Sequence, residues 1–440
     1  MKAHWSNAFY GVLDYLAYPL GLLLLAPVIL RGLGMERYGI WVVVNATLNS
    51  GAILASGFGD ANIRLVAIER GKHQRDVLIH AVRSALGIHL VLGILTAIMG
   101  LLISPALTQS ALKNYGSLRG DCTWSFRITA VLILIRALET VCVSTQRAFA
   151  RYGAAIQVSV VARLASLLAA ALIPSCSRCV WAIMAATLAA SIVSFWIQFR
   201  QLLRLLGVPS LTPMIHLEGS REILRFGGFT WIQAASALLF GQVDRIIAAA
   251  MFGAAAVASY SLCVQLAQPI YGVSAAGLHF MFPLLASGSR TSTAVTMRRS
   301  ILKALAANVA FVAIALFALL YFGNAILSAW GGASLASAGA PLLPAIAWSA
   351  ALSSLSVTGC YSLLALGRPR IVTALNLLGG FAMLAAIPTL TRHYGLAGIA
   401  YARLLAGPAT LLVYLPLFFG LTNRSLRAPG TDFVSLCEES

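Results

Sequence analysis

Eight ionisable side chains lie within otherwise apolar segments, where a charged group is unusual. These residues are Asp14, Asp60, Arg136, Glu139, Arg163, Asp244, Arg245 and Arg403. A charge within a membrane is costly and usually faces a cavity or a partner, where it often marks an ion pathway. We therefore predict ion coupling by Asp244, Asp60 and Glu139.

Each of these carboxylates also has a structural interpretation. Arg136 and Glu139 are three residues apart on one predicted helix, so they can neutralise each other there. Asp244 fits an ion pair as well as a proton carrier. Asp60 and Arg64 fit a position where a helix leaves the membrane.

Polar residues at helical spacing mark wet faces on three predicted spans. Asn45 and Asn49 share a face of the second span, and Ser261, Gln265 and Gln268 begin a stripe along the eighth. The substrate-contact candidates are Asp14, Asn45, Asn49, Arg64, Arg245, Gln265, Gln268 and Arg403. The alternative is that small and amide residues hold helices together, which we prefer for Ser349, Ser353 and Ser356.

Enzyme and metal sites have weak support. Cys176 and Cys179 form one CxxC, without the second pair that a zinc site needs, so they are either a disulfide or unpaired. No nucleophile lies beside a base, and we expect no cofactor and no metal. The longest outer loop, near 105–126, has Asp121 as its only carboxylate, which argues against a glycosyltransferase or polymerase.

Composition predicts an all-α membrane protein. Sixty per cent of the 440 residues are hydrophobic and 10% are charged, against about 25% charged in soluble domains. The apolar residues form blocks of about 20, which is the length of a membrane-spanning helix. We predict about twelve spans, at 9–30, 39–63, 84–104, 127–145, 156–173, 180–199, 228–250, 257–285, 304–322, 341–366, 371–390 and 398–421.

Basic residues set the orientation. If the amino terminus is cytoplasmic, the inner segments hold 20 Lys and Arg residues and the outer segments 7, which is the positive-inside bias and puts both termini in the cytoplasm. The net charge of +18 therefore reflects topology, and we expect no binding of nucleic acid, because no basic patch is paired with exposed stacking aromatics.

The spans divide into two sets of six. We predict an amino-terminal lobe at 1–205, a cytoplasmic linker with a carboxy-terminal lobe at 206–421, and a cytoplasmic tail at 422–440. The first turn of each half begins with a glycine, Gly34 or Gly253, followed five residues later by a small residue and seven later by an aromatic. Such repeats predict two pseudo-symmetric six-helix lobes around a central cavity.

Three segments carry a family resemblance. The run from Arg31 to Trp41, the run Gln242-Val-Asp244-Arg245 and the run from Tyr394 to Ala400 resemble Wzx-type polysaccharide transporters. These are lipid-linked oligosaccharide flippases of the multidrug, oligosaccharidyl-lipid and polysaccharide exporter superfamily, and the resemblance covers nearly the whole chain. It implies that spans one, two, seven and eight line the central cavity.

The resemblance also implies a function. An undecaprenyl-diphosphate-linked glycan would move to the outer leaflet of the bacterial inner membrane by alternating access, for surface polysaccharide synthesis. A polysaccharide polymerase and its chain-length machinery would be partners, and an ion gradient can supply energy to an antiporter. The alternative within transport is a drug or metabolite exporter of the same superfamily. A membrane glycosyltransferase or polymerase is the alternative from another class.

Overall fold

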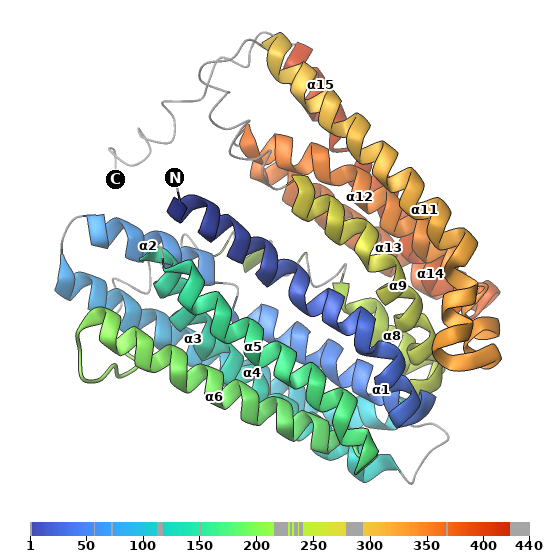
Figure 1. Cartoon of the computed structure of the whole chain (residues 1–440), viewed down its shortest axis with the longest axis horizontal. Coiled ribbons are helices and arrows are strands. Elements are labelled where there is room, and N and C mark those ends of the chain that lie inside the picture. Colours follow the sequence, from blue (N-terminus) through green and yellow to red (C-terminus); the bar gives the residue numbers. More distant parts are fainter. Residues whose placement is uncertain are drawn as a thin grey trace. The chain divides into compact units, whose positions relative to one another are not determined.

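The computed structural model describes residues 2–56, 58–71, 74–111, 118–149, 151–214, 228, 231–232, 236, 241–278, 294–366 and 368–422, and the regular elements in these ranges are helices (Figure 1). The first half contains α1 (Lys2–Ser56), α2 (Gly59–Gly71), α3 (Arg75–Ala111), α4 (Arg119–Ala148), α5 (Tyr152–Leu172), the 3-10 helix η2 (Ile173–Ser175) and α6 (Val180–Leu206). The second half contains α8 (Val243–Phe252), α9 (Ala254–Leu278), α11 (Ala294–Gly339), α12 (Leu343–Ala365), α13 (Pro369–Tyr394), α14 (Ala397–Leu411) and α15 (Tyr414–Thr422).

Nine candidate spans are found in the described residues, by length and apolar composition. The prediction of an all-α membrane protein is therefore confirmed. Predicted span one and most of predicted span two fall in α1, which is counted once although Gly34 breaks it, and the end of span two falls in α2. Predicted spans seven and eight correspond to α8 and α9, which are not among the nine. The count of twelve remains a prediction.

Two glycines form matching elbows in the chain. Gly34 has φ 77° and ψ 166°, and Gly253 between α8 and α9 has φ 83° and ψ 176°. Side chains rarely tolerate a positive φ, so glycine is the natural residue at both points. The sequence pattern had aligned these same two positions as equivalent turns, and their backbone angles agree. Gly332 bends α11 with similar angles.

Packing divides the chain into two compact units. Unit 1 comprises residues 1–265 and 325–340, and unit 2 comprises 266–324 and 341–440. The predicted lobe boundary at residue 205 is not among the points where the chain passes from one unit to the other. The division into two six-helix lobes remains a prediction, and the polar tail from residue 423 onward lies outside the described residues.

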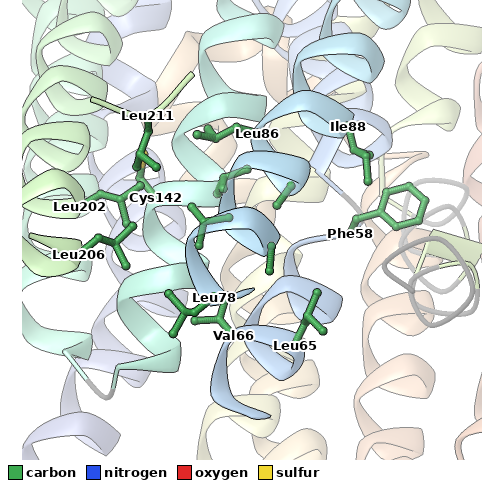
Figure 2. Close-up of a cluster of buried hydrophobic side chains, with 14 of the residues drawn as sticks. Phe58, Leu65, Val66, Leu78, Leu86, Ile88, Cys142, Leu202, Leu206 and Leu211 are labelled. Atoms are coloured by element: carbon green, nitrogen blue, oxygen red, sulfur yellow. The ribbon is translucent and has the colours of Figure 1, made fainter. Parts of the chain in front are cut away.

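Helix α4 is the centre of packing in unit 1, where it contacts α1, α2, α3, α5 and α6. Small residues allow these approaches: a side chain at Gly51 of α1 would meet Ile133 of α4. Figure 2 shows a buried hydrophobic cluster between α2, α3, α4 and α6, to which Leu65, Leu86 and Leu202 belong. This apolar packing holds α4, the helix that carries Arg136 and Glu139, in place.

Two arginines of unit 1 donate hydrogen bonds to backbone carbonyls at the ends of neighbouring helices. Arg75 at the start of α3 donates from Nη2 to the carbonyls of Leu206 (2.9 Å) and Gly207 (3.1 Å) at the end of α6. Arg70 of α2 donates to the Ala148 carbonyl that ends α4. A cation at a helix carboxyl end satisfies unpaired carbonyls and complements the helix dipole. These basic residues therefore stabilise the fold.

Unit 2 is held by a neutral polar network. Asn308 of α11 accepts a hydrogen bond from Ser274 of α9 (2.7 Å) and donates to the carbonyl of Ser354 on α12 (3.0 Å). Ser349 of α12 donates to the carbonyl of Arg403 on α14, as predicted for a residue that holds helices together. The Ser356 hydroxyl instead bonds the carbonyl of Ser353 on its own helix. No charge enters these contacts, which fits structural roles.

Candidate functional site

Three arginines of unit 1 converge on one tyrosine. Tyr18 lies on α1, within electrostatic range of Arg136 on α4, Arg245 on α8 and Arg163 on α5. We call these four residues the arginine cluster. The helices that carry them pack together, because α1 contacts α4, α5 and α8. The fold thus gathers three cations that are far apart in the sequence.

The cluster lies deep within its helices. Arg136 is 12 residues from the nearer end of α4, or roughly 18 Å at 1.5 Å per residue. Arg163 is 9 residues from the nearer end of α5, or roughly 14 Å. A hydrocarbon layer is about 30 Å thick, so both residues are near the middle of their spans. Cations at such a depth are costly unless they serve a partner or a ligand.

Two of the guanidinium groups have unused donors. The Nε atoms of Arg136 and Arg245 are buried and have no hydrogen-bond partner among the described residues. Buried donors are normally satisfied, and an unsatisfied one costs about 1–3 kcal/mol. A bound anion with several oxygens would satisfy them, since guanidinium groups favour phosphate and carboxylate oxygens. The cluster is therefore a candidate anion site.

A buried tyrosine extends the site toward α9. The charge of Arg245 also acts on the hydroxyl of Tyr38. That hydroxyl and the amide of Gln265 are hydrogen-bonded, with Gln265 Nε2 at 3.0 Å and Oε1 at 3.2 Å. Gln265 was predicted to contact substrate, and the structure shows instead a side chain that is 6% exposed and bonded to Tyr38. Its role as a binding residue remains a prediction.

Asp244 is fully buried in the hairpin of α8 and α9. Its Oδ2 accepts a hydrogen bond from the Tyr260 hydroxyl at 2.6 Å, and its Oδ1 accepts one from the backbone N–H of Arg245 at 2.8 Å. Tyr260 is the aromatic residue seven positions after Gly253, which the repeat pattern had marked. The carboxylate thus ties the start of α8 to α9, and ion coupling by Asp244 remains a prediction.

Glu139 faces a different side of α4. Its Oε1 accepts hydrogen bonds from Ser194 of α6 (2.5 Å) and Ser159 of α5 (3.5 Å). Serines of two other helices therefore bind this carboxylate, and its neutralisation by Arg136 remains a prediction.

The other predicted site residues are scattered. Asn45 and Asn49 are half-buried on α1, and the Asn45 amide donates to the Trp41 carbonyl of its own helix. Arg64 is half-buried on α2. Gln268 and Arg403 belong to unit 2. The side chains of Asp14 and Asp60 lie outside the described residues.

Sequence reasoning missed part of the cluster. It marked Arg136 and Arg163 as costly but did not place them at the binding site, and Tyr18 was not among the candidate site residues. Their convergence depends on α1 packing against both α4 and α5, which no spacing within one helix reveals. Cys176 and Cys179, the other motif of interest, are both free cysteines.

Family comparison decides the class of protein. The family described as "Polysaccharide biosynthesis protein" matches residues 5–289, which is more than half of the chain. The chain belongs to this family. A comparison with curated proteins found no match.

Solved structures agree with that family. The chain is similar to an inward-facing multidrug resistance MATE family transporter of the MOP superfamily, with TM-score 0.75 and 14% identity over 96% of this chain and 100% of that one. It is also similar to the lipid II flippase MurJ, inward closed, with TM-score 0.74 and 12% identity over 95% and 87%. A MOP superfamily transporter from Pyrococcus furiosus, described as having a binding pocket of reverse polarity, gives 0.63 and 14% over 97% and 96%. At these identities the likeness concerns the fold alone.

Proposed function

We propose that this family member flips an undecaprenyl-diphosphate-linked oligosaccharide from the cytoplasmic to the outer leaflet of the bacterial inner membrane. The observation that carries the proposal is the arginine cluster, in which Arg136 and Arg163 lie near the middle of α4 and α5 and Arg245 lies near the start of α8. Membership in the polysaccharide biosynthesis family supports a glycan substrate. The fold shared with a lipid II flippase supports the transport of a lipid-linked one.

The chemistry of the head group fits the cluster. A diphosphate carries several oxygens and negative charge, and it cannot enter hydrocarbon without replacements for its water. Arg136, Arg163 and Arg245 would supply these, and charge-assisted hydrogen bonds contribute about 1.5–3 kcal/mol each. Neutral groups such as Asn45 and Asn49 suit sugar hydroxyls, whereas the lipid tail would remain in the bilayer. The other predicted contacts, Asp14, Arg64, Gln265, Gln268 and Arg403, are kept as candidates.

The setting of the protein follows from the same proposal. Both termini would be cytoplasmic, because the basic residues gather on the segments between the corresponding spans. A polysaccharide polymerase and chain-length machinery would use the product on the outer side. The transporter would require no cofactor, and Asp244, Asp60 and Glu139 are the proposed ion-coupling carboxylates.

A drug or metabolite exporter is the second candidate. The similarity in fold to a multidrug resistance transporter favours it. A site for cationic or apolar drugs would place carboxylates and aromatics at its centre, because buried like charges repel. Three arginines around one tyrosine have the opposite polarity, so we prefer the flippase.

Purified protein in liposomes provides the test. Arg136→Gln and Arg245→Gln each remove one cation, and each should weaken flipping of an undecaprenyl-diphosphate disaccharide about 10- to 150-fold, which corresponds to the loss of one charged hydrogen bond. Arg127→Gln is the matched control, because Arg127 is an exposed residue of the same helix that stacks on Trp124. Full flipping by both cluster variants, or transport of drugs in place of the lipid, would contradict the proposal.

A further inference from the structure

The helix α6 exposes a short polar stripe near its end. Trp196, Arg200 and Arg204 are all exposed, and their spacing of four residues places them on one face of the helix. The other side of α6 packs into unit 1, where Gln198 and Leu202 are fully buried. We call the three exposed residues the α6 stripe, and it faces away from the packed interior of unit 1.

The apolar part of α6 indicates the depth of the stripe in a bilayer. From Val180 to Ile197 the helix is apolar, interrupted only by small hydroxyl residues. This run is roughly 27 Å long at 1.5 Å per residue, against a hydrocarbon layer of about 30 Å. Trp196 therefore lies at the border of the hydrocarbon, where tryptophan is enriched. Arg200 and Arg204 follow roughly 6 and 12 Å later along the helix, at the level of the lipid head groups.

The indole of Trp196 holds the first of these arginines. The Cζ atom of Arg200 lies 5.3 Å from the centroid of the Trp196 ring, which is the geometry of a cation–π contact. Stacking uses the flat face of a guanidinium group and leaves the N–H donors at its edge available for an anion. Fixing a long side chain costs entropy when a ligand binds. Because the contact with Trp196 already restricts Arg200, this cost is smaller here.

A third cation lies at the end of α6. Arg75 of α3 donates from Nη2 to the carbonyls of Leu206 and Gly207, and Arg204 belongs to the same last turn of α6. The sequence of α6 contains no acidic residue. Asp76, which follows Arg75 and is exposed, is the acidic neighbour at this end. The stripe together with Arg75 is therefore a net positive surface at the head-group level.

The apolar residues beside the arginines favour a lipid over a soluble anion. Val193 precedes Trp196 by three residues on the same face of α6, and the two side chains are 55% and 57% exposed. Acyl chains can cover this apolar surface while a head group meets the arginines. Inorganic phosphate or an acidic peptide has no such tail.

We propose that the α6 stripe and Arg75 bind the head group of an anionic phospholipid. The lipid phosphate accepts charge-assisted hydrogen bonds from Arg200 and Arg204, and the acyl chains lie along α6 beside Trp196. Under the predicted topology this end of α6 is cytoplasmic, so the lipid belongs to the cytoplasmic leaflet. The proposal does not depend on the transported substrate, because none of these residues belongs to the arginine cluster.

The expected selectivity follows from the charges. An arginine near a membrane surface favours an anionic lipid by about fivefold. The two arginines of the α6 stripe should therefore favour phosphatidylglycerol over the zwitterionic phosphatidylcholine by about 25-fold. Because both side chains are exposed, high salt should reduce this preference.

Tryptophan quenching by brominated lipids tests the site on the full-length protein in vesicles. Phosphatidylglycerol with brominated acyl chains is mixed at a low fraction into phosphatidylcholine, and a second series carries the bromine on phosphatidylcholine instead. Comparing each protein with its own Trp196→Phe variant isolates the fluorescence of Trp196 from that of the other tryptophans. In the wild type, phosphatidylglycerol should quench Trp196 well above the level set by its fraction in the vesicle.

Arginine variants assign the effect to the stripe. Arg200→Gln combined with Arg204→Gln should lower the preference for phosphatidylglycerol by about 25-fold, so that quenching follows the bulk composition. Arg127→Gln is the matched control, because Arg127 also stacks on an exposed tryptophan, Trp124, at 4.9 Å. It lies near the start of α4, whose Asp121 is bonded to the start of α6, and it should leave the quenching of Trp196 unchanged.

Three results would overturn the proposal. The first is quenching of wild-type Trp196 that follows the bulk composition, a measurement that needs no arginine variant. The second is an equal loss of the preference in the Arg127→Gln control. The third is displacement of the brominated lipid by millimolar inorganic phosphate, which would indicate a site for a soluble anion. Thermal unfolding of the double variant, unchanged from wild type, checks that it is folded.

Discussion

Gly39 of α1 lies directly against the backbone of Ala254 at the start of α9, and an added methyl group tests this contact. A Cβ atom at this position would lie 1.8 Å from the carbonyl oxygen of Ala254, 2.4 Å from its carbonyl carbon and 3.0 Å from its Cα. These atoms are backbone at the start of α9, so no flexible side chain can turn away. For Gly39→Ala, α1 and α9 must separate by about 1.2 Å merely to bring the shortest contact to the limit of real structures.

The expected cost can be estimated. Overpacking typically costs about 1–3 kcal/mol, and backbone on both sides favours the upper end, whereas a helical Gly→Ala change returns about 1 kcal/mol. A net loss of about 2 kcal/mol follows. Unit 1 has about 280 residues, and with about 2.1 cal/mol/K of unfolding entropy per residue this loss lowers Tm by about 3 °C.

Thermal unfolding of the detergent-solubilised protein measures the shift. Gly100→Ala is the control, because Gly100 is also helical, in α3, and has nothing within 4 Å of its added Cβ. That variant gains helix propensity, so its Tm should stay equal or rise by about 2 °C. Gly39→Ala with wild-type stability, or an equal loss in the control, would refute the reasoning.

Two further predictions concern buried carboxylates and helix ends. Tyr260→Phe removes one hydrogen bond to Asp244 and should cost about 1 kcal/mol of stability. Asp244→Asn should abolish flipping at normal membrane abundance only if the charge of Asp244 is functional. Measuring membrane abundance and flipping together distinguishes a functional charge from a structural one. Asp121 accepts hydrogen bonds from Val180 N (3.0 Å) and Trp181 N (2.8 Å) at the start of α6, so Asp121→Ala should destabilise by about 0.5–2 kcal/mol in thermal unfolding, and Asp121→Asn by less.

The positions of many helices could be predicted from local patterns in the sequence. Predicted spans overlap α3, α4, α5, α6, α12 and α13 because apolar length is a local property. The glycine pattern also located both elbows, since a positive φ demands a particular residue. Helix ends were less well placed: α4 begins at Arg119, whereas the predicted span begins at Arg127. Polar first turns extend a helix beyond the apolar run that the pattern detects.

The candidate site was less predictable, since it depends on which helices meet. Arg136 and Glu139 were correctly marked as costly, but their spacing suggested a pair with each other. The packing of α4 against α1, α5 and α6 brings the hydroxyl of Ser194 to the carboxylate and Tyr18 within electrostatic range of the Arg136 charge. Contacts between helices that are far apart in the sequence determine which groups surround each side chain. The periodicity within one helix carries no information about those contacts.

The distribution of the chain between the two units restricts where it can be cut into two fragments. Unit 1 takes its last residues, 325–340, from the end of α11, whereas the earlier part of that helix belongs to unit 2. A gene cut between residues 214 and 241 would yield a first fragment without α8, without the beginning of α9 and without this late segment. Arg31 of that fragment would lose the carbonyls of Ala329 and Trp330 to which it donates. The second product of such a split gene contains all of unit 2 together with the missing parts of unit 1. The first product therefore cannot complete unit 1 unless the second is present, and truncation at the sequence midpoint does not yield two independent halves.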